Sequence, residues 1–93
     1  MGRTVVFSVH AARRMFERGM SADDVVEVVG RGETIEDYPE DTPYPSKLLL
    51  GQPEGRPIHV VVALNEADDE TIVVTVYEPD PSKWEPGFRR RML

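Results

Sequence analysis

Two groups of residues in this 93-residue chain have the types and spacing that acid–base chemistry on a phosphate requires. The first group lies in two segments rich in β-branched residues, 58–64 and 71–77, which are typical of strands. Alternate residues of a strand share a face, so pairing the two segments places His59, Thr75 and Tyr77 together. Histidine titrates near neutral pH, and a phenol donates a hydrogen bond. The alternative interpretation is an ordinary cross-strand pair that contributes about 0.2–1 kcal/mol.

The second group follows the helical spacing i, i+4, i+8 and consists of His10, Arg14 and Arg18, with Arg13 beside it. These positions form one stripe on a helix surface. Arginine is suited to bidentate phosphate contacts, so the stripe is a candidate phosphate-binding surface. The alternative is a solvated helix face in which Arg13 and Glu17 form an i, i+4 ion pair.

A hairpin is expected to position the first group, with residues 65–70 as its polar connection. Burying the apolar set of each arm together restricts the register and sets His59 opposite either Tyr77 or Thr75. The apolar sets expected to face the core are Ile58, Val60, Val62 and Leu64 on the first arm and Ile72, Val74 and Val76 on the second.

Two helices are expected to carry the second group and to cover the sheet. Ser8 is a candidate N-cap for a helix over residues 9–18 that ends at Gly19, and Ser21 is a candidate N-cap for a helix that ends near residue 29. The apolar half of the first helix is expected to face the core. It comprises Val9, Ala11, Ala12, Met15 and Phe16.

Short strands are expected at residues 3–7, 33–38 and 46–51. The pattern predicts a single α+β domain over residues 1–85, with an N-terminal strand, two helices and then an antiparallel sheet of three to four strands. Trp84 is expected to anchor the proline-containing segment after the hairpin, and the arginine-rich residues 86–93 are expected to form a flexible tail.

Composition narrows the function classes. The chain has no cysteine and two histidines without metal-ligand spacing, so the sequence predicts neither a metal site nor a cofactor. Its net charge of −6 argues against strong non-specific binding of nucleic acid, although the N-terminal third and the last residues are locally basic. No apolar run approaches the ~20 residues of a membrane span, and we expect a cytoplasmic protein without a membrane partner.

Several motifs resemble, in order, those of an uncharacterised bacterial family of small proteins. They are His10–Met15, Glu17–Ser21, Asp24–Val25, Ile35–Pro39, Leu48–Gly51, Arg56–Val60 and Thr75–Trp84. In element order that family is similar to the RelE/ParE-type toxins of bacterial toxin–antitoxin pairs. The resemblance implies a RelE-like fold with helices on one face of the sheet, an antitoxin protein as partner, and RNA as a candidate substrate.

The first functional hypothesis is therefore a metal-independent endoribonuclease acting on mRNA, or an inactive relative. His10 and His59 are its candidate acid and base, Arg14 and Arg18 bind phosphate, and Tyr77 donates a hydrogen bond or stacks on a base. Arg13, Tyr38 and Thr75 are further candidate substrate contacts.

The second hypothesis is a non-catalytic module that binds itself, as a homodimer, or another protein. The two hypotheses differ in whether the candidate site residues lie close together in space. The candidate residues of an enzyme surround one concavity, whereas His10 and His59 are expected on opposite sides of the sheet unless the first helix crosses near its edge.

Overall fold

The computed structural model of the chain describes residues 3–93. It contains two helices and five strands, with a short 3-10 helix (Pro53–Gly55) before the hairpin. In chain order the elements are β1 (Thr4–Phe7), α1 (Val9–Arg18), α2 (Ala22–Arg31), β2 (Glu33–Tyr38), β3 (Ser46–Gly51), β4 (Ile58–Asn65) and β5 (Glu70–Tyr77).

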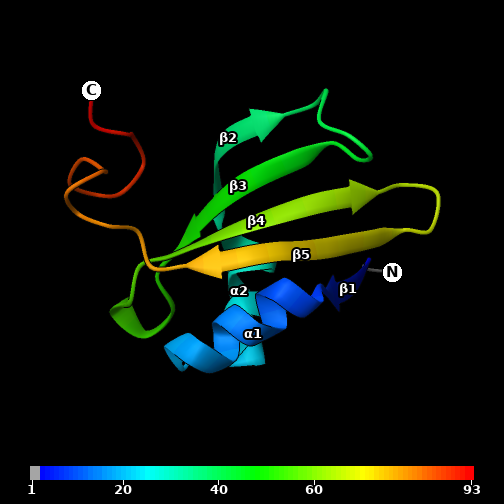
Figure 1. Ribbon diagram of the computed structural model, residues 1–93, viewed down its shortest axis with the longest axis horizontal. Helices are drawn as coiled ribbons and strands as arrows, with labels where there is room; N and C mark the ends of the chain where they lie inside the picture. The colour runs from blue at the N-terminus through cyan, green and yellow to red at the C-terminus, as the bar shows by residue number, and fades with distance from the viewer. Residues whose placement is uncertain (1–2) are drawn as a thin grey trace.

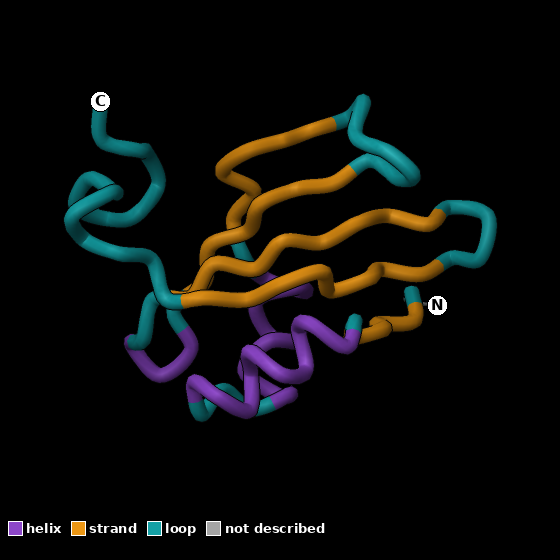
Figure 2. Tube along the Cα trace, in the orientation of Figure 1, coloured by secondary structure: helices purple, strands orange, loops and turns teal. Residues whose placement is uncertain are grey.

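The five strands form one sheet in the order β1-β5-β4-β3-β2, and both helices pack on one of its faces (Figures 1 and 2). We call the opposite side of the sheet the outer face. The α+β prediction is confirmed, but the sheet is mixed rather than antiparallel. The N-terminal strand β1 joins the edge beside β5 and runs parallel to it, from Thr4 opposite Glu70 to Phe7 opposite Val73.

Both helices begin at the expected serines. The Ser8 hydroxyl accepts a hydrogen bond from the Ala11 amide at 3.0 Å, and the Ser21 hydroxyl accepts one from the Asp24 amide at 3.1 Å. Helix α1 ends at Gly19 in the left-handed conformation, with φ of 64°. Helix α2 continues to Arg31, two residues beyond the predicted end.

The core lies between the helices and the sheet. Its buried side chains come from both helices and the three central strands, chiefly Ala11, Met15, Val25, Val28, Leu49, Ile58, Val60, Val62, Val73 and Val76. Close approach of α2 to β3 depends on Gly51, because a Cβ at this position would lie 2.6 Å from Cγ2 of Val28.

One strand departs from the predicted pattern through a bulge. Val61 lies opposite Thr75, but Val62 lies opposite Val73, so Val74 has no partner residue on β4. The predictions that Ile72 and Val74 face the core are therefore wrong: Val73 is fully buried in the core, Ile72 lies opposite Ala63 on the outer face, and Val74 is 37% exposed. The register next to His59 is unaffected, and His59 lies opposite Tyr77 as one of the two expected pairings requires.

Helix α1 is also rotated from its predicted orientation. Ala11 and Met15 are buried, but Val9 and Phe16 are 80% and 89% exposed. Hydrogen bonds from side chains to backbone carbonyls hold both ends of the helix in this rotation. The Ser8 hydroxyl donates to the Val74 carbonyl at 2.9 Å, and the Arg56 guanidinium donates to the Arg18 carbonyl at 2.7 Å. These anchors hold the helix with its small Ala11 against the sheet, and the apolar half is divided between core and solvent.

Candidate functional site

The imidazole of His59 is the buried centre of a polar cluster on the outer face. Strand β4 places this side chain between Leu50 of β3 and Tyr77 of β5. Its Nδ1 atom lies 3.2 Å from the Tyr77 hydroxyl, and its Nε2 atom lies 2.9 Å from the Phe88 carbonyl oxygen. A carbonyl only accepts, so Nε2 carries a proton and, in the neutral ring, Nδ1 accepts from Tyr77.

The segment of residues 78–93 covers this imidazole. The segment leaves the end of β5 and folds back, with Trp84 bridged to Arg91 (Figure 1). The Trp84 ring packs edge-on against the His59 ring with centroids 4.4 Å apart, and Trp84 is only 4% exposed. Anchoring by Trp84 is thus confirmed. The arginine-rich residues expected as a flexible tail lie in contact with the sheet.

Two arginines of this segment pair with carboxylates of β2. Arg91 donates to both oxygens of Glu36, at 2.9 and 3.2 Å, and Arg89 donates to Glu33 at 2.8 Å. The Tyr38 hydroxyl donates to the same Glu36 carboxylate. The Arg91 guanidinium also lies 4.7 Å from the centre of the Trp84 ring, in a cation–π contact. The segment is therefore held by charge-assisted bonds on β2 and by aromatic packing on β4.

Burial and charge set the protonation states of this cluster. Burial lowers the pKa of His59 below its ordinary value, and the hydrogen bond to the Phe88 carbonyl and the nearby Glu36 charge offset part of that effect. Hydrogen bonds from Arg91 lower the pKa of Glu36, and burial raises the pKa of Tyr77. At neutral pH the site holds a neutral imidazole, a carboxylate and two protonated phenols.

The lowered pKa of His59 predicts a pH-dependent stability. The unfolded chain binds a proton at this residue near pH 6.5, whereas the folded chain resists it. The free energy of unfolding should therefore fall as the pH drops from 7 to about 5, by at most about 1.4 kcal/mol per pH unit from this group. Urea titrations across this range measure the slope.

His59→Gln keeps an N–H donor for the Phe88 carbonyl but cannot titrate, so this variant should remove the contribution of His59 to that slope. His10→Gln is the matched control for the substitution of a histidine by glutamine, because His10 is exposed on α1, on the other face of the sheet. An equal slope in the wild-type protein and in His59→Gln would contradict the assignment.

The structure divides the predicted site residues between the two faces of the sheet. His59, Tyr77, Thr75 and Tyr38 belong to the outer face, and the first three lie on the paired strands β4 and β5. The remaining candidates lie on α1, which packs on the other face, and they are His10, Arg13, Arg14 and Arg18. The two histidines do not share a site in this structure, because α1 packs against the core face of β5 and does not reach His59.

Three residues that complete the cluster were not predicted as site residues: Glu36, Phe88 and Arg91. The charge pattern gave a partial signal, since an acidic middle and a basic end favour each other electrostatically. No local pattern indicated that Phe88 would present its carbonyl to His59, because that contact joins residues 29 positions apart.

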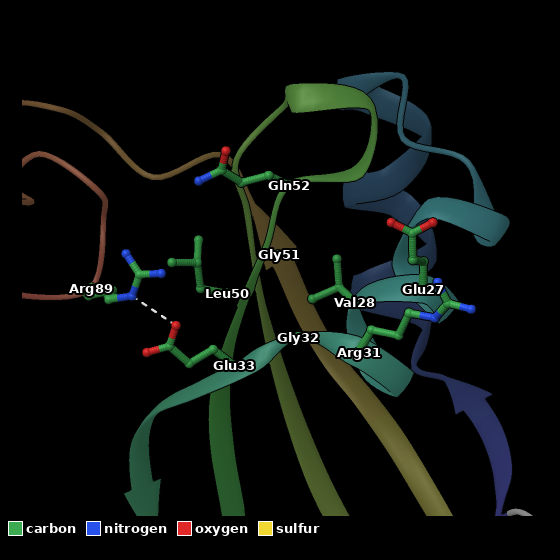
Figure 3. Close-up of a pocket in the computed structure, with 9 residues that line it drawn as sticks. All are labelled: Glu27, Val28, Arg31, Gly32, Glu33, Leu50, Gly51, Gln52 and Arg89. Carbon is green, nitrogen blue, oxygen red and sulfur yellow. Dashed lines mark hydrogen bonds and ion pairs between the residues drawn. The ribbon is translucent and has the colours of Figure 1, made fainter.

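A cavity of about 310 Å³ lies beside this cluster, between the end of α2 and the strands β2 and β3 (Figure 3). Figure 3 shows the Arg89–Glu33 pair on one side of it and the side chains of Arg31 and Glu27 on the other. Its charged lining is therefore mixed in sign. Among residues 3–93, no three His, Cys, Asp or Glu side chains are grouped so that they could hold a metal ion.

Comparison with known protein families assigns the chain to one of them. A family model described as a domain of unknown function (DUF4258) matches residues 7–78. The chain belongs to this family. In this DUF4258 protein the matched region contains Glu36, His59 and Tyr77, and the covering residues Trp84, Phe88 and Arg91 follow it.

The chain was also compared with curated proteins and with solved structures. No significant match to a curated protein was found, and none to a solved structure. Within residues 3–93 no helix is long and apolar enough to cross a membrane.

Proposed function

We propose that this DUF4258 protein is a non-catalytic protein-binding module that docks a partner on helix α1. The observation that carries the proposal is the exposure of Val9 and Phe16, 80% and 89%. With the exposed Ala12 they follow the spacing i, i+3, i+7, so they form one apolar stripe along the outward side of α1. We call these three residues the α1 stripe. An exposed apolar stripe on an otherwise amphipathic helix is typical of a surface that a partner covers.

The state of His59 supports a non-catalytic role. A general acid or base must reach the proton that it transfers. Both ring nitrogens of His59 are occupied by Tyr77 and Phe88, and the residue has no exposed surface. The arginines of α1 lie on the other side of the sheet and cannot bind a phosphate presented to this imidazole. The cluster around His59 is better explained as the anchor of the C-terminal segment.

A second candidate function is the RelE/ParE-like ribonuclease of a toxin–antitoxin pair. The observation that favours it is the network of Glu36, Tyr38 and Arg91 beside Tyr77, because a carboxylate and a guanidinium can serve as base and phosphate ligand in RNA cleavage. This network is partly exposed, with the side chains of Glu36 and Arg91 at 22% and 61%. If the protein is such a toxin, the protein that binds α1 is its antitoxin.

Inducible expression in a bacterial host separates the two candidates. We expect normal growth and no new RNA 5′ ends from folded, abundant protein. We also expect a protein partner, either an untagged second copy of the chain or another co-expressed protein, to co-purify with the tagged wild-type chain and to be lost from Phe16→Ser. Val26→Ser is the matched control, because Val26 is also exposed but lies on α2, outside the α1 stripe. Growth arrest with new 5′ ends, abolished by Glu36→Gln, would replace the proposal by the ribonuclease.

A further inference from the structure

The outer face carries a groove at the end of the sheet that the C-terminal segment does not cover. There the end of β2, the loop after it and the adjacent strands form an open groove of about 670 Å³. Its apolar lining includes Tyr38, Pro39 and Val61, and its carboxylates are those of Asp37, Glu40 and Asp41. We call this hollow the β2 groove. Tyr38 is 44% exposed beside it, so an aromatic surface is accessible there.

The β2 groove is held in shape by the loop after β2. The Asp41 carboxylate accepts hydrogen bonds from the Ser46 hydroxyl at 2.6 Å and from the Thr42 amide at 3.1 Å. These bonds connect the loop to the start of β3. The groove is therefore a built feature with an apolar lining and negative charge.

The α1 stripe has the complementary chemistry. Its apolar residues extend over roughly 10 Å of helix, at 1.5 Å per residue. Arg13 follows the stripe residue Ala12 and is exposed. Across residues 3–93, none of the α1 arginines takes part in an ion pair. A helix with exposed aromatic and aliphatic residues and unpaired guanidiniums matches an apolar groove with carboxylates, through hydrophobic contact at the centre and charge pairing around it.

We propose that the occupant of the β2 groove is helix α1 of a second copy of this chain, with Phe16 in the groove and Arg13 facing its carboxylates. This inference rests on the proposed function, because it assigns the partner of the same α1 stripe. Both surfaces occur on one chain, and their charges are opposite. The groove lies within residues 33–85, which carry three basic and thirteen acidic residues, whereas α1 carries three arginines.

The position of the two surfaces determines what kind of assembly forms. Helix α1 packs on one face of the sheet (Figure 1). The strand register places Tyr38 and Val61 on the other face. Two copies therefore cannot exchange both contacts at once, as a two-fold dimer requires. Each copy instead inserts α1 into one neighbour and accepts α1 from another, which gives a head-to-tail series. The contact of one helix stripe is small, and copies of net charge −6 repel each other, so the association is weak.

Sedimentation equilibrium of the full chain tests this arrangement at concentrations from about 10 μM to about 1 mM, the range that detects weak association. We expect the average mass of the wild-type protein to rise beyond that of a dimer. Phe16→Asp removes the α1 contact, and Tyr38→Lys removes the aromatic lining of the groove and sets a positive charge against Arg13, so each variant alone should associate at least roughly tenfold more weakly. Val26→Asp is the matched control, because Val26 is exposed on α2, and its series should equal that of the wild type.

Mixing the two defective variants gives the decisive result. The Phe16→Asp chain keeps a working β2 groove, and the Tyr38→Lys chain keeps a working α1. An equal mixture should therefore form a 1:1 dimer and stop there, since no further contact is available. Thermal melting of each variant confirms that it is folded.

Three outcomes would overturn this inference. They are a wild-type protein that stays monomeric up to the highest concentration, association that survives Phe16→Asp, and a mixture that does not form the 1:1 dimer. A monomer that still co-purifies a different protein through Phe16 would overturn only the second copy as occupant and would leave the binding module in place. A monomer that co-purifies nothing would overturn both.

Discussion

Replacing Trp84 with alanine should lower the free energy of unfolding by about 3–5 kcal/mol, the range typical of a buried tryptophan. Trp84 is 4% exposed and contacts both the His59 ring and the Arg91 guanidinium, so the substitution leaves a cavity on the outer face and releases the C-terminal segment. A domain of this size has a total stability of only about 5–14 kcal/mol, which makes this a large fraction. Urea denaturation measures the change.

Phe16→Ala is the control for this prediction, because it also removes an aromatic side chain but from a position that is 89% exposed. Its free energy of unfolding should stay within about 0.5 kcal/mol of the wild-type value. Equal losses for the two variants would contradict both the burial of Trp84 and the exposure of Phe16.

Release of the C-terminal segment has a second consequence that can be measured in the same variant. Burial is the main cause that lowers the pKa of His59. When Trp84 no longer covers the ring, the pKa should return toward its ordinary value, and the dependence of stability on pH between 7 and 5 should weaken. A Trp84→Ala variant with an unchanged pH slope would show that the other contacts keep His59 buried.

His59→Ala should destabilise the protein by about 3 kcal/mol, because it creates a cavity and leaves buried polar groups without a partner. The hydroxyl of Tyr77 and the carbonyl of Phe88 each lose the bond that the imidazole makes at 3.2 and 2.9 Å. The loss should be close to constant above pH 7, where the ring is neutral in both the folded and the unfolded chain. Chemical denaturation at pH 7.5 measures the change without interference from titration.

The chain contains its own control for this experiment in its other histidine. His10 is exposed on α1, so His10→Ala should change the free energy of unfolding by less than about 0.5 kcal/mol. A small effect for both variants would mean that His59 is dispensable for stability. It would then favour a functional explanation of the cluster around it, and the ribonuclease candidate would gain.

The sequence alone determined the elements and much of their pairing. Ser8, Ser21 and Gly19 mark helix ends through local hydrogen-bond chemistry that involves neighbours three or four residues away. The hairpin from β4 to β5 follows from two β-branched runs with a polar connection, and burial of their apolar sets limits His59 to a position opposite Tyr77 or Thr75, of which the structure has Tyr77. These features depend on short sequence separations, where residue type is sufficient to predict the outcome.

The tertiary structure decided which residues from distant segments join His59 and Tyr77 in one cluster. The rotation of α1 depends on anchors from Val74 and Arg56, distant in sequence, so no helical periodicity could reveal that Phe16 is exposed and Met15 buried. The bulge at Val74 reverses the faces of β5 locally, which a strict alternation cannot represent. The C-terminal segment reaches His59 and Glu36 through contacts that span 29 and 55 residues. Contacts of that kind are selected by packing of the whole domain, and they have no local pattern in the sequence.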